Sequence, residues 1–167
     1  MCLANLVTEE FGKNKWEDVL EKAGFPRTTF FLATQDVEDT VTMKVINSAC
    51  EVLNISLLQA ANAFGDFWMN NFAVKIYQPF YRGVTSAKDF LLSVDKIHVT
   101  ATQTIPNAHP PRFDYEWKNE KTLIMTYKSP RGLIDFLVGL IHGVAKYYHE
   151  DLTITKLSSD KVEIIFK

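Results

Sequence analysis

The stretch from Ser86 to Arg112, SAKDFLLSVDKIHVTATQTIPNAHPPR, decides the fold of this chain. Ser86 followed by Asp89 is typical of a helix start, because the hydroxyl and the carboxylate can accept from amide groups that the first turn leaves free. The helix is expected to run towards Pro106. Its apolar residues recur at three- and four-residue steps: Phe90, Leu91, Val94, Ile97, Ala101 and Ile105. His98 lies beside this apolar face, so we expect its imidazole to point towards the interior.

An interior histidine has two explanations. One is a neutral core histidine whose ring nitrogens are both hydrogen bonded, which is the commoner case for an isolated residue. The other is a ligand of a metal or of haem iron, because neutral imidazole is the commonest metal-binding side chain. The helix that carries His98 does not distinguish the two, and a second stretch is needed.

Composition limits the class of protein. The 167 residues fit a single domain, residues 1–167, and 47% hydrophobic with 13% aromatic residues can supply both a core and an apolar cavity. With 18 basic and 20 acidic residues and no long like-charge block, nucleic acid is not an expected partner. Cys2 and Cys50 lie far apart, which indicates neither a zinc site nor a disulfide framework and favours a reduced, cytoplasmic compartment. No apolar run reaches the about 20 residues that span a bilayer, so no membrane is expected.

The periodicity predicts an α+β fold with helices in the N-terminal half. Residues 67–77 are apolar nearly all round, which predicts a buried helix. After the prolines the period changes. We expect a hairpin of residues 112–117 and 122–127, a helix from Pro130 to about Tyr148 capped by Ser129, and a second hairpin of residues 152–157 and 161–166.

The second informative stretch is YKSPR, residues 127–131, between a predicted strand and a predicted helix. A helix start favours an anion, since its amide groups are free and the helix dipole is positive there. Tyr127 and Ser129 add hydroxyl donors and Arg131 adds a forked cation suited to a carboxylate. The alternative is a helix cap followed by a surface arginine paired with an aspartate.

Three features together resemble the haem-nitric oxide/oxygen binding family, H-NOX, the sensor domain also found in soluble guanylate cyclases. They are the interior histidine at the end of FLLSVDKIH, the Tyr-x-Ser-x-Arg motif of residues 127–131 and the PPR of residues 110–112. AFGDFWMNNF and FLVGLIHG extend the similarity over nearly the whole chain. The resemblance implies the H-NOX fold, in which haem lies between a helical N-terminal half and a C-terminal antiparallel sheet with one long helix.

The resemblance also implies roles for individual residues. The cofactor would be haem b, iron protoporphyrin IX, with His98 as its axial ligand and Pro111 as the proline that bends the porphyrin. Its propionates would be held by the motif residues Tyr127, Ser129 and Arg131. The opposite face of the haem would be lined by Trp68, Met69, Phe72, Phe136 and Leu140.

One position in that lining carries a functional prediction. Oxygen on ferrous haem carries partial negative charge and needs a hydrogen-bond donor, whereas nitric oxide binds tightly without one. The tyrosine that supplies this donor in oxygen-binding members corresponds here to Phe136, although the Trp68 indole N–H is left open as a donor. We therefore expect a sensor of nitric oxide, and of CO, that excludes oxygen. The resemblance implies no catalysis by the domain, and a separate histidine kinase or cyclic-di-GMP enzyme as signalling partner.

Two other classes of function are compatible with parts of the pattern. A haem-free module could bind an apolar carboxylate through Arg131 and Tyr127. A haem peroxidase is not favoured, because His109, His142 and His149 are expected at the surface or in connections.

Relatives usually begin with a few more residues, so the chain is either trimmed or has a more open pocket. The Cys/His cluster of some relatives is missing, so no zinc is expected.

Overall fold

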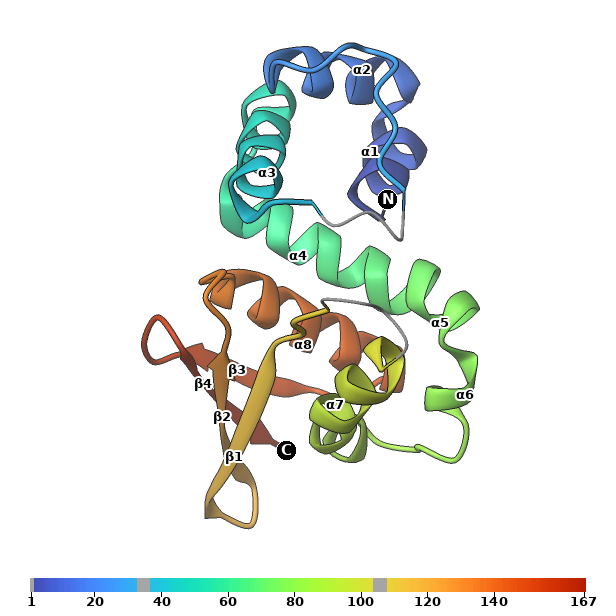
Figure 1. The fold of residues 1–167 in the computed structure, drawn as a ribbon. Helices are drawn as coiled ribbons and strands as arrows, with labels where there is room; N and C mark the ends of the chain where they lie inside the picture. The colour runs from blue at the N-terminus through green and yellow to red at the C-terminus, as the bar shows by residue number, and fades with distance from the viewer. Residues whose placement is uncertain (1, 33–36, 104–107) are drawn as a thin grey trace. The chain divides into compact units, whose positions relative to one another are not determined.

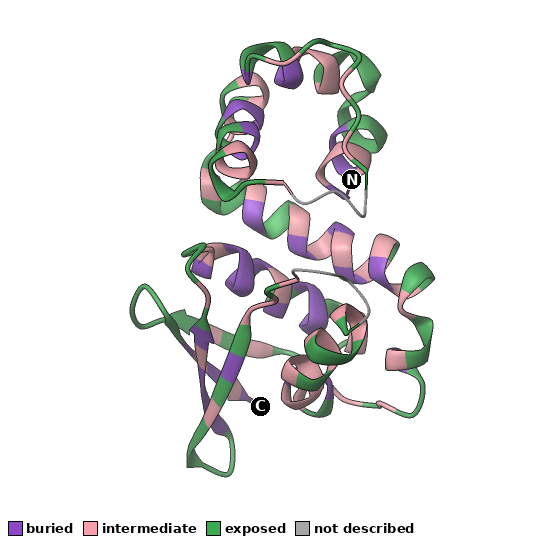
Figure 2. Ribbon diagram, viewed as in Figure 1, coloured by how far each residue is buried: buried purple, intermediate pink, exposed green. Residues whose placement is uncertain are grey.

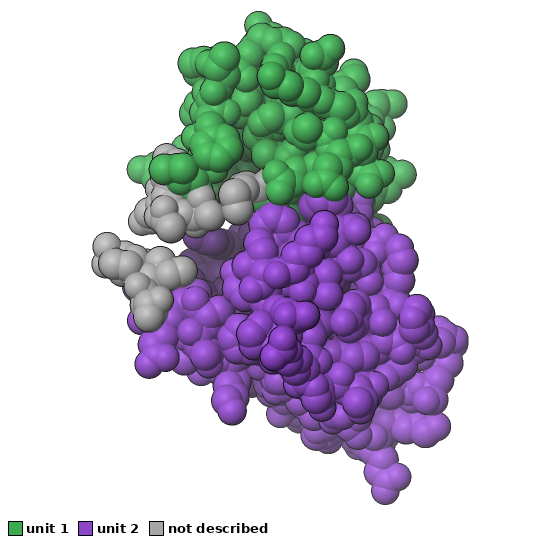
Figure 3. Space-filling model, turned by 90° about the vertical axis from the view of Figure 1, so that its right-hand side faces the viewer, with its two compact units in different colours: residues 1–60 green, residues 61–167 purple. Residues whose placement is uncertain are grey.

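A computed structural model of the chain describes residues 2–32, 37–103 and 108–167. The chain divides into two compact units, residues 1–60 and 61–167 (Figure 3). Every residue that the sequence suggested for a haem site belongs to the second unit. In the described residues no single helix is long and apolar enough to cross a membrane. The helical segments Asp39–Leu53 and Leu57–Ile76 together have the length and composition to do so, but they are bent by 104° relative to each other.

The first unit is helical, as its periodicity predicted. It contains α1 (Cys2–Phe11), α2 (Lys13–Lys22), α3 (Asp39–Leu53) and the first turn of α4 (Leu57–Phe67). Val19 and Ala23 at the end of α2 are fully buried and pack with Val45 and Ala49 of α3. This unit therefore has a small core of its own.

Local signals set the ends of two of these helices. Asn54 ends α3 in the left-handed conformation, with φ at 53°. Ser56 then caps α4, because its Oγ accepts from the N–H of Gln59 at 3.2 Å while the Gln59 side chain accepts from the N–H of Ser56 at 2.8 Å. This reciprocal pair satisfies two amide groups that the first turn leaves free.

The second unit continues α4 into a π-helix, η1 (Trp68–Phe72), and then into α5 (Ala73–Ile76), α6 (Gln78–Tyr81) and α7 (Ala87–Thr102). The sequence predicted ordinary helix over residues 67–77, so η1 is a correction. The Asn70 amide donates to the Asp66 carbonyl oxygen at 3.1 Å and also to that of Gly143 at 3.3 Å. A side chain that competes for a backbone acceptor in this way disturbs the regular helical ladder.

Helix α7 begins where the sequence placed it. The Ser86 Oγ accepts from the N–H of Asp89 at 3.1 Å, which confirms the predicted cap. The helix ends at Thr102. Its predicted continuation towards Pro106 runs into residues 104–107, which lie outside the described part of the chain.

Four antiparallel strands form one sheet in the order β1-β2-β4-β3 (Figure 1). Both predicted hairpins are confirmed, as β1 (Arg112–Asn119) with β2 (Thr122–Lys128) and β3 (Leu152–Lys156) with β4 (Lys161–Phe166). Because side chains alternate along a strand, one face of the sheet carries most of the buried residues. These are Phe113, Leu123, Met125, Tyr127, Val162, Ile164 and Phe166.

Helix α8 (Ile134–Tyr148) packs against β3, α7 and η1 and is buried along much of its length (Figure 2). It begins four residues later than predicted. Gly132 lies in the left-handed region with φ at 62°, so the chain makes a turn after Pro130 and Ser129 is not the helix cap. The cap position belongs to Leu133.

Helices α4 and α8 meet backbone to backbone. A Cβ atom on Gly139 would lie 2.1 Å from the carbonyl oxygen of Ala61, and one on Gly65 would lie 2.1 Å from the carbonyl of Gly139. Only glycine permits an approach this close. The helices together with the four-stranded sheet confirm the α+β prediction. Gly65 and Gly139 allow the close approach of α4 and α8.

Candidate functional site

His98 lies on α7 with a defined ring orientation. Its Nδ1 is 2.8 Å from the carbonyl oxygen of Val94, and because a carbonyl can only accept, Nδ1 carries the proton. Nε2 therefore keeps its lone pair. Burial lowers the pKa of His98, against smaller opposing effects of the Val94 carbonyl and the Asp95 carboxylate, so the ring is neutral near pH 7. A neutral imidazole fixed by a backbone carbonyl is a typical setting for a metal ligand.

Phe113 connects His98 to the predicted anion motif. Its ring centroid is 5.4 Å from that of His98 and 5.9 Å from that of Tyr127. Phe113 and Tyr127 are paired across β1 and β2. The structure thus brings His98 and Tyr127, which lie far apart in the sequence, around one aromatic ring. Phe113 was missed as a site residue, and the alternation of RFDYEW was the signal that could have found it.

The motif of residues 127–131 lies in the turn between β2 and α8. Tyr127 is buried near the end of β2, and its backbone N–H donates to the carbonyl of Asp160 at 2.7 Å. The Ser129 Oγ accepts from the N–H of Arg131 at 3.3 Å, while the Arg131 side chain is exposed. Because α8 begins only at Ile134, the helix-start argument for anion binding is wrong. The capacity to bind a carboxylate rests instead on the hydroxyl and guanidinium donors.

Five residues were predicted to line the face of the haem opposite His98. Three of them, Trp68, Phe72 and Phe136, form an aromatic group with Phe64. Phe64 stacks on Trp68 at 6.0 Å between ring centroids and meets Phe136 edge-on at 5.5 Å. Trp68 in turn stacks on Phe72 at 5.2 Å. Phe136 is 8% exposed. Phe64 was not among the predicted site residues, although it lies four residues before Trp68 and thus on the same side of a helix.

The other two predicted lining residues are not part of this group of rings, although Trp68 packs against the same core as they do. Met69 belongs to the hydrophobic core that contains Phe113 and Tyr127, and Leu140 packs against that core. The Tyr81 hydroxyl lies 3.5 Å from the Met69 carbonyl oxygen and 3.7 Å from its Sδ. Met69 is therefore placed mainly as a core residue.

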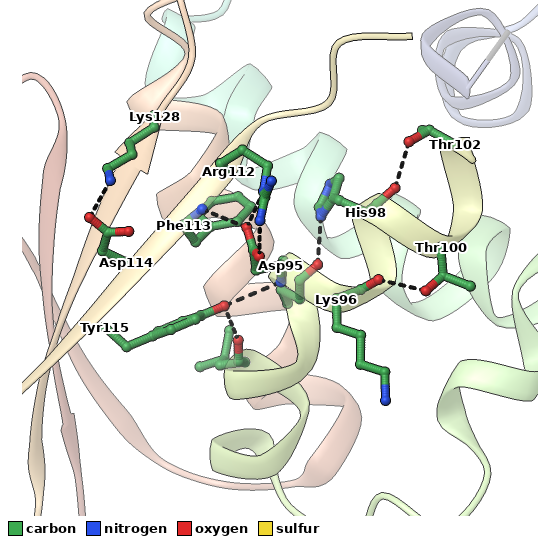
Figure 4. A network of polar contacts seen from close by, with 12 residues as sticks. Asp95, Lys96, His98, Thr100, Thr102, Arg112, Phe113, Asp114, Tyr115 and Lys128 are labelled. Atoms are coloured by element: carbon green, nitrogen blue, oxygen red, sulfur yellow. Dashed lines mark hydrogen bonds and ion pairs between the residues drawn. The ribbon is translucent and has the colours of Figure 1, made fainter. Parts of the chain in front are cut away.

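An ion pair ties α7 to the start of β1 (Figure 4). The Asp95 carboxylate accepts from Nε and Nη2 of Arg112 at 2.7 Å each, and from the N–H of Phe113 at 2.9 Å. The Arg112 guanidinium is the main reason that the pKa of Asp95 falls to about 2. Pro111, half-buried, directly precedes this anchored strand. The pair fixes the beginning of β1 beside the turn of α7 that carries His98.

The three remaining histidines, His109, His142 and His149, are exposed, as predicted. Among the described residues, those suited to haem are an imidazole whose Nε2 keeps its lone pair, buried aromatic side chains, and a turn with hydrogen-bond donors for a carboxylate. Haem requires an iron ligand, an apolar setting and partners for its two acid groups. The chemistry of these residues fits it.

Solved structures with the same fold carry the H-NOX name. An oxygen-binding H-NOX domain related to soluble guanylate cyclases matches with a TM-score of 0.83 and 20% identity, over 99% of this chain and 92% of that chain. A Cs H-NOX mutant that carries an unnatural amino acid matches with a TM-score of 0.85 and 20% identity, over 99% and 93% of the two chains. The fold of this chain is the H-NOX fold.

Sequence comparison identifies the family. The family model described as haem-NO-binding, HNOB, matches residues 1–156, and the chain belongs to that family. Soluble guanylate cyclase gcy-35 of Caenorhabditis elegans is 24% identical over 162 residues, which are 95% of this chain and 24% of gcy-35. Soluble guanylate cyclase gcy-32 of the same organism is 27% identical over 158 residues, 92% and 23% of the two. The chain spans about a quarter of the length of these relatives.

Proposed function

We propose that residues 1–167 form one haem b-binding sensor domain that responds to nitric oxide, and to CO, while excluding oxygen. The observation that carries the proposal is the setting of His98. The hydrogen bond from Nδ1 to the Val94 carbonyl leaves Nε2 as the nitrogen with a lone pair, which an iron ligand needs. Haem held there would supply the ferrous iron at which a diatomic gas binds.

The remaining attachments follow from the same residues. Tyr127, Ser129 and Arg131 would hold the propionates, and Pro111 would contact the porphyrin from the side of β1. Phe113, between the rings of His98 and Tyr127, would keep the ligand and the propionate motif at a fixed spacing. The face for the gas would be lined by Trp68, Met69, Phe72, Phe136 and Leu140.

The choice of gas rests on Phe136. The ring is buried and packs edge-on against Phe64 at 5.5 Å, so this position offers an apolar edge and no hydroxyl. Among the rings of Phe64, Trp68, Phe72 and Phe136, only the indole carries a polar atom. Phe136 withholds the hydrogen bond that a tyrosine hydroxyl would give to bound oxygen, whereas nitric oxide does not depend on one.

The proposal includes a signalling partner. By the family resemblance this would be a histidine kinase or a cyclic-di-GMP enzyme in the cytoplasm, addressed by a change in the position of α7. The Asp95–Arg112 pair and the contact of His98 with Phe113 join α7 to the sheet. A displacement of His98 would therefore also displace β1.

Absorption spectra of the purified ferrous protein test the proposal. We expect a haem spectrum that changes on addition of nitric oxide and, in a separate sample, on addition of CO, and that shows no stable oxygen complex in air. His98→Ala should lose haem. A haem-free protein that binds an apolar carboxylate through Arg131 would overturn the assignment.

A matched pair of variants tests the choice of gas. Phe136→Tyr should gain a stable oxygen complex, because it adds one hydroxyl donor at a buried ring. Phe136→Leu keeps an apolar side chain and should still exclude oxygen. Oxygen binding by the unaltered protein in air would defeat the proposed selectivity.

A further inference from the structure

The hydroxyl group of Tyr115 lies within the hydrogen-bond ladder of α7, one turn before His98 (Figure 4). It donates to the carbonyl oxygen of Leu91 at 2.9 Å and accepts from the backbone N–H of Asp95 at 3.3 Å. In an α-helix these two backbone groups are partners of each other, since the N–H of residue i bonds to the carbonyl of residue i−4. A side chain from the sheet therefore enters one rung of α7, a contact of the kind that bends helices.

That rung lies directly beside the group that orients His98. The His98 Nδ1 donates to the carbonyl of Val94 at 2.8 Å, and Val94 lies between Leu91 and Asp95 in the chain. A change in the tilt of this turn moves the Val94 carbonyl. The imidazole must follow it, because its Nδ1–H is bonded there.

The position of Tyr115 is set by the sheet and not by α7. Tyr115 is paired with Met125 of β2, which is fully buried, and Phe113 lies two residues earlier on the same face of β1. The Asp95 carboxylate is anchored to the same strand through Arg112 and the N–H of Phe113. Strand β1 thus contacts the turn before His98 in two ways. Tyr115 bonds to its backbone at Leu91 and Asp95, and Arg112 and the N–H of Phe113 bond to the Asp95 side chain.

The hydroxyl can serve both backbone groups because it keeps its proton. Burial is the main reason that the pKa of Tyr115 rises to about 12. A neutral phenol donates one hydrogen bond and still accepts another. Phenylalanine would fill nearly the same space and could do neither.

We propose that Tyr115 is a positioning residue for His98, whose hydroxyl, by entering the Leu91–Asp95 rung, sets the orientation in which His98 Nε2 is offered to iron. The inference rests on the proposed function, in which His98 is the iron ligand. In this role the Tyr115 hydroxyl orients His98 and contributes little to the stability of the fold. Without the hydroxyl, the Leu91 carbonyl and the Asp95 N–H still have each other as the partners that an α-helix provides, so the fold loses little while this turn of α7 loses its tie to β1.

The test compares Tyr115→Phe with Tyr148→Phe in the full chain. Tyr148 is a matched control, because its hydroxyl is buried and has no hydrogen-bond partner among the described residues. Each variant removes one oxygen from a half-buried ring. In resonance Raman spectra of the ferrous protein, we expect the iron–histidine stretching band to shift in Tyr115→Phe and to stay in place in Tyr148→Phe, with thermal unfolding close to that of the unaltered protein in both.

A second measurement reports on the contact itself. In ¹⁵N–¹H spectra of the ferrous protein saturated with CO, the Asp95 amide should be among the most displaced signals in Tyr115→Phe and unmoved in Tyr148→Phe. An Asp95 amide that moves without any shift of the iron–histidine band would overturn the positioning role, and so would two unchanged spectra. If the unaltered protein shows no such band, or keeps it in His98→Ala, the proposed function fails instead.

Discussion

Substitution of Gly139 by alanine should destabilise the protein, although alanine is the better helix former. Helix propensity alone favours the change by about 1 kcal/mol. Against this, the new Cβ would lie 2.1 Å from the Ala61 carbonyl oxygen and 2.6 Å from its carbon, where ordinary contact needs 3.4–4 Å. Both obstacles are backbone atoms of α4, which cannot rotate away as a side chain can.

The two helices would have to separate by about 1 Å, which loosens the packing along their whole contact. Overpacking of a core costs about 1–3 kcal/mol, and a backbone obstacle places this case at the upper end of that range. Set against the propensity gain, this leaves a net loss of about 2 kcal/mol in the free energy of unfolding. For a chain of this size that lowers the unfolding temperature by about 4–8 °C.

Urea unfolding followed by circular dichroism measures the effect, with the unaltered protein and the variant prepared at equal haem content. Ala63→Gly, at an exposed position of α4, calibrates the propensity and should cost about 1 kcal/mol. If Gly139→Ala proves as stable as the unaltered protein, the close backbone approach of α4 and α8 is not present in solution and the reasoning fails.

Single contacts give three further predictions. Asp95→Asn should lower the free energy of unfolding by about 1–2 kcal/mol near neutral pH, because Arg112 holds the pKa of Asp95 at about 2, below its usual 3.8, while solvent around the exposed guanidinium screens part of the effect. This stabilisation is complete above the unfolded pKa and is lost as the pH falls from about 4 towards 2, so a deficit as large at pH 3 as at pH 6 in urea would contradict it. Ser56→Ala should cost about 1 kcal/mol by removing the cap of α4, measured by urea unfolding against Thr28→Ala, an exposed turn residue. His98→Gly should lose bound haem and regain it when imidazole is added, as read from the absorption spectrum, and haem retained without imidazole would show a different ligand.

Much of the fold could be predicted because the deciding signals are local. The cap of α7 involves Ser86 and Asp89, three residues apart, and the cap of α4 involves Ser56 and Gln59. Both hairpins were visible as alternation over a few residues. Such signals depend only on near neighbours, so a single sequence displays them.

The errors have long-range or competing causes. The π-helix η1 is accompanied by a bond from Asn70 to Gly143, 73 residues further along the chain. The start of α8 was misplaced because Ser129 and Pro130 are good start signals, whereas Gly132, in the left-handed region, continues the turn beyond them. A propensity argument cannot weigh a distant partner or a backbone angle that the packing selects.

The candidate site shows the same division. His98 and the motif of residues 127–131 could be found from the chain alone, because each is a short pattern with its own chemistry. Phe113, which brings His98 and Tyr127 together, was overlooked as a site residue because its role depends on contacts with two other elements. Phe64 was also missed, although its contact with Trp68 is local and only its contact with Phe136 is long-range.

The sequence by itself determined which chemical groups are present: an imidazole on an amphipathic helix, hydroxyl and guanidinium donors in one turn, and a ring without a hydroxyl at Phe136. Only the tertiary structure decided that Asp95 is the carboxylate that holds Arg112. It also decided that Tyr115 enters the ladder of α7. The contacts of Arg112 and Tyr115 depend on the packing of β1 against α7, which joins residues 17 to 24 positions apart that no local periodicity relates.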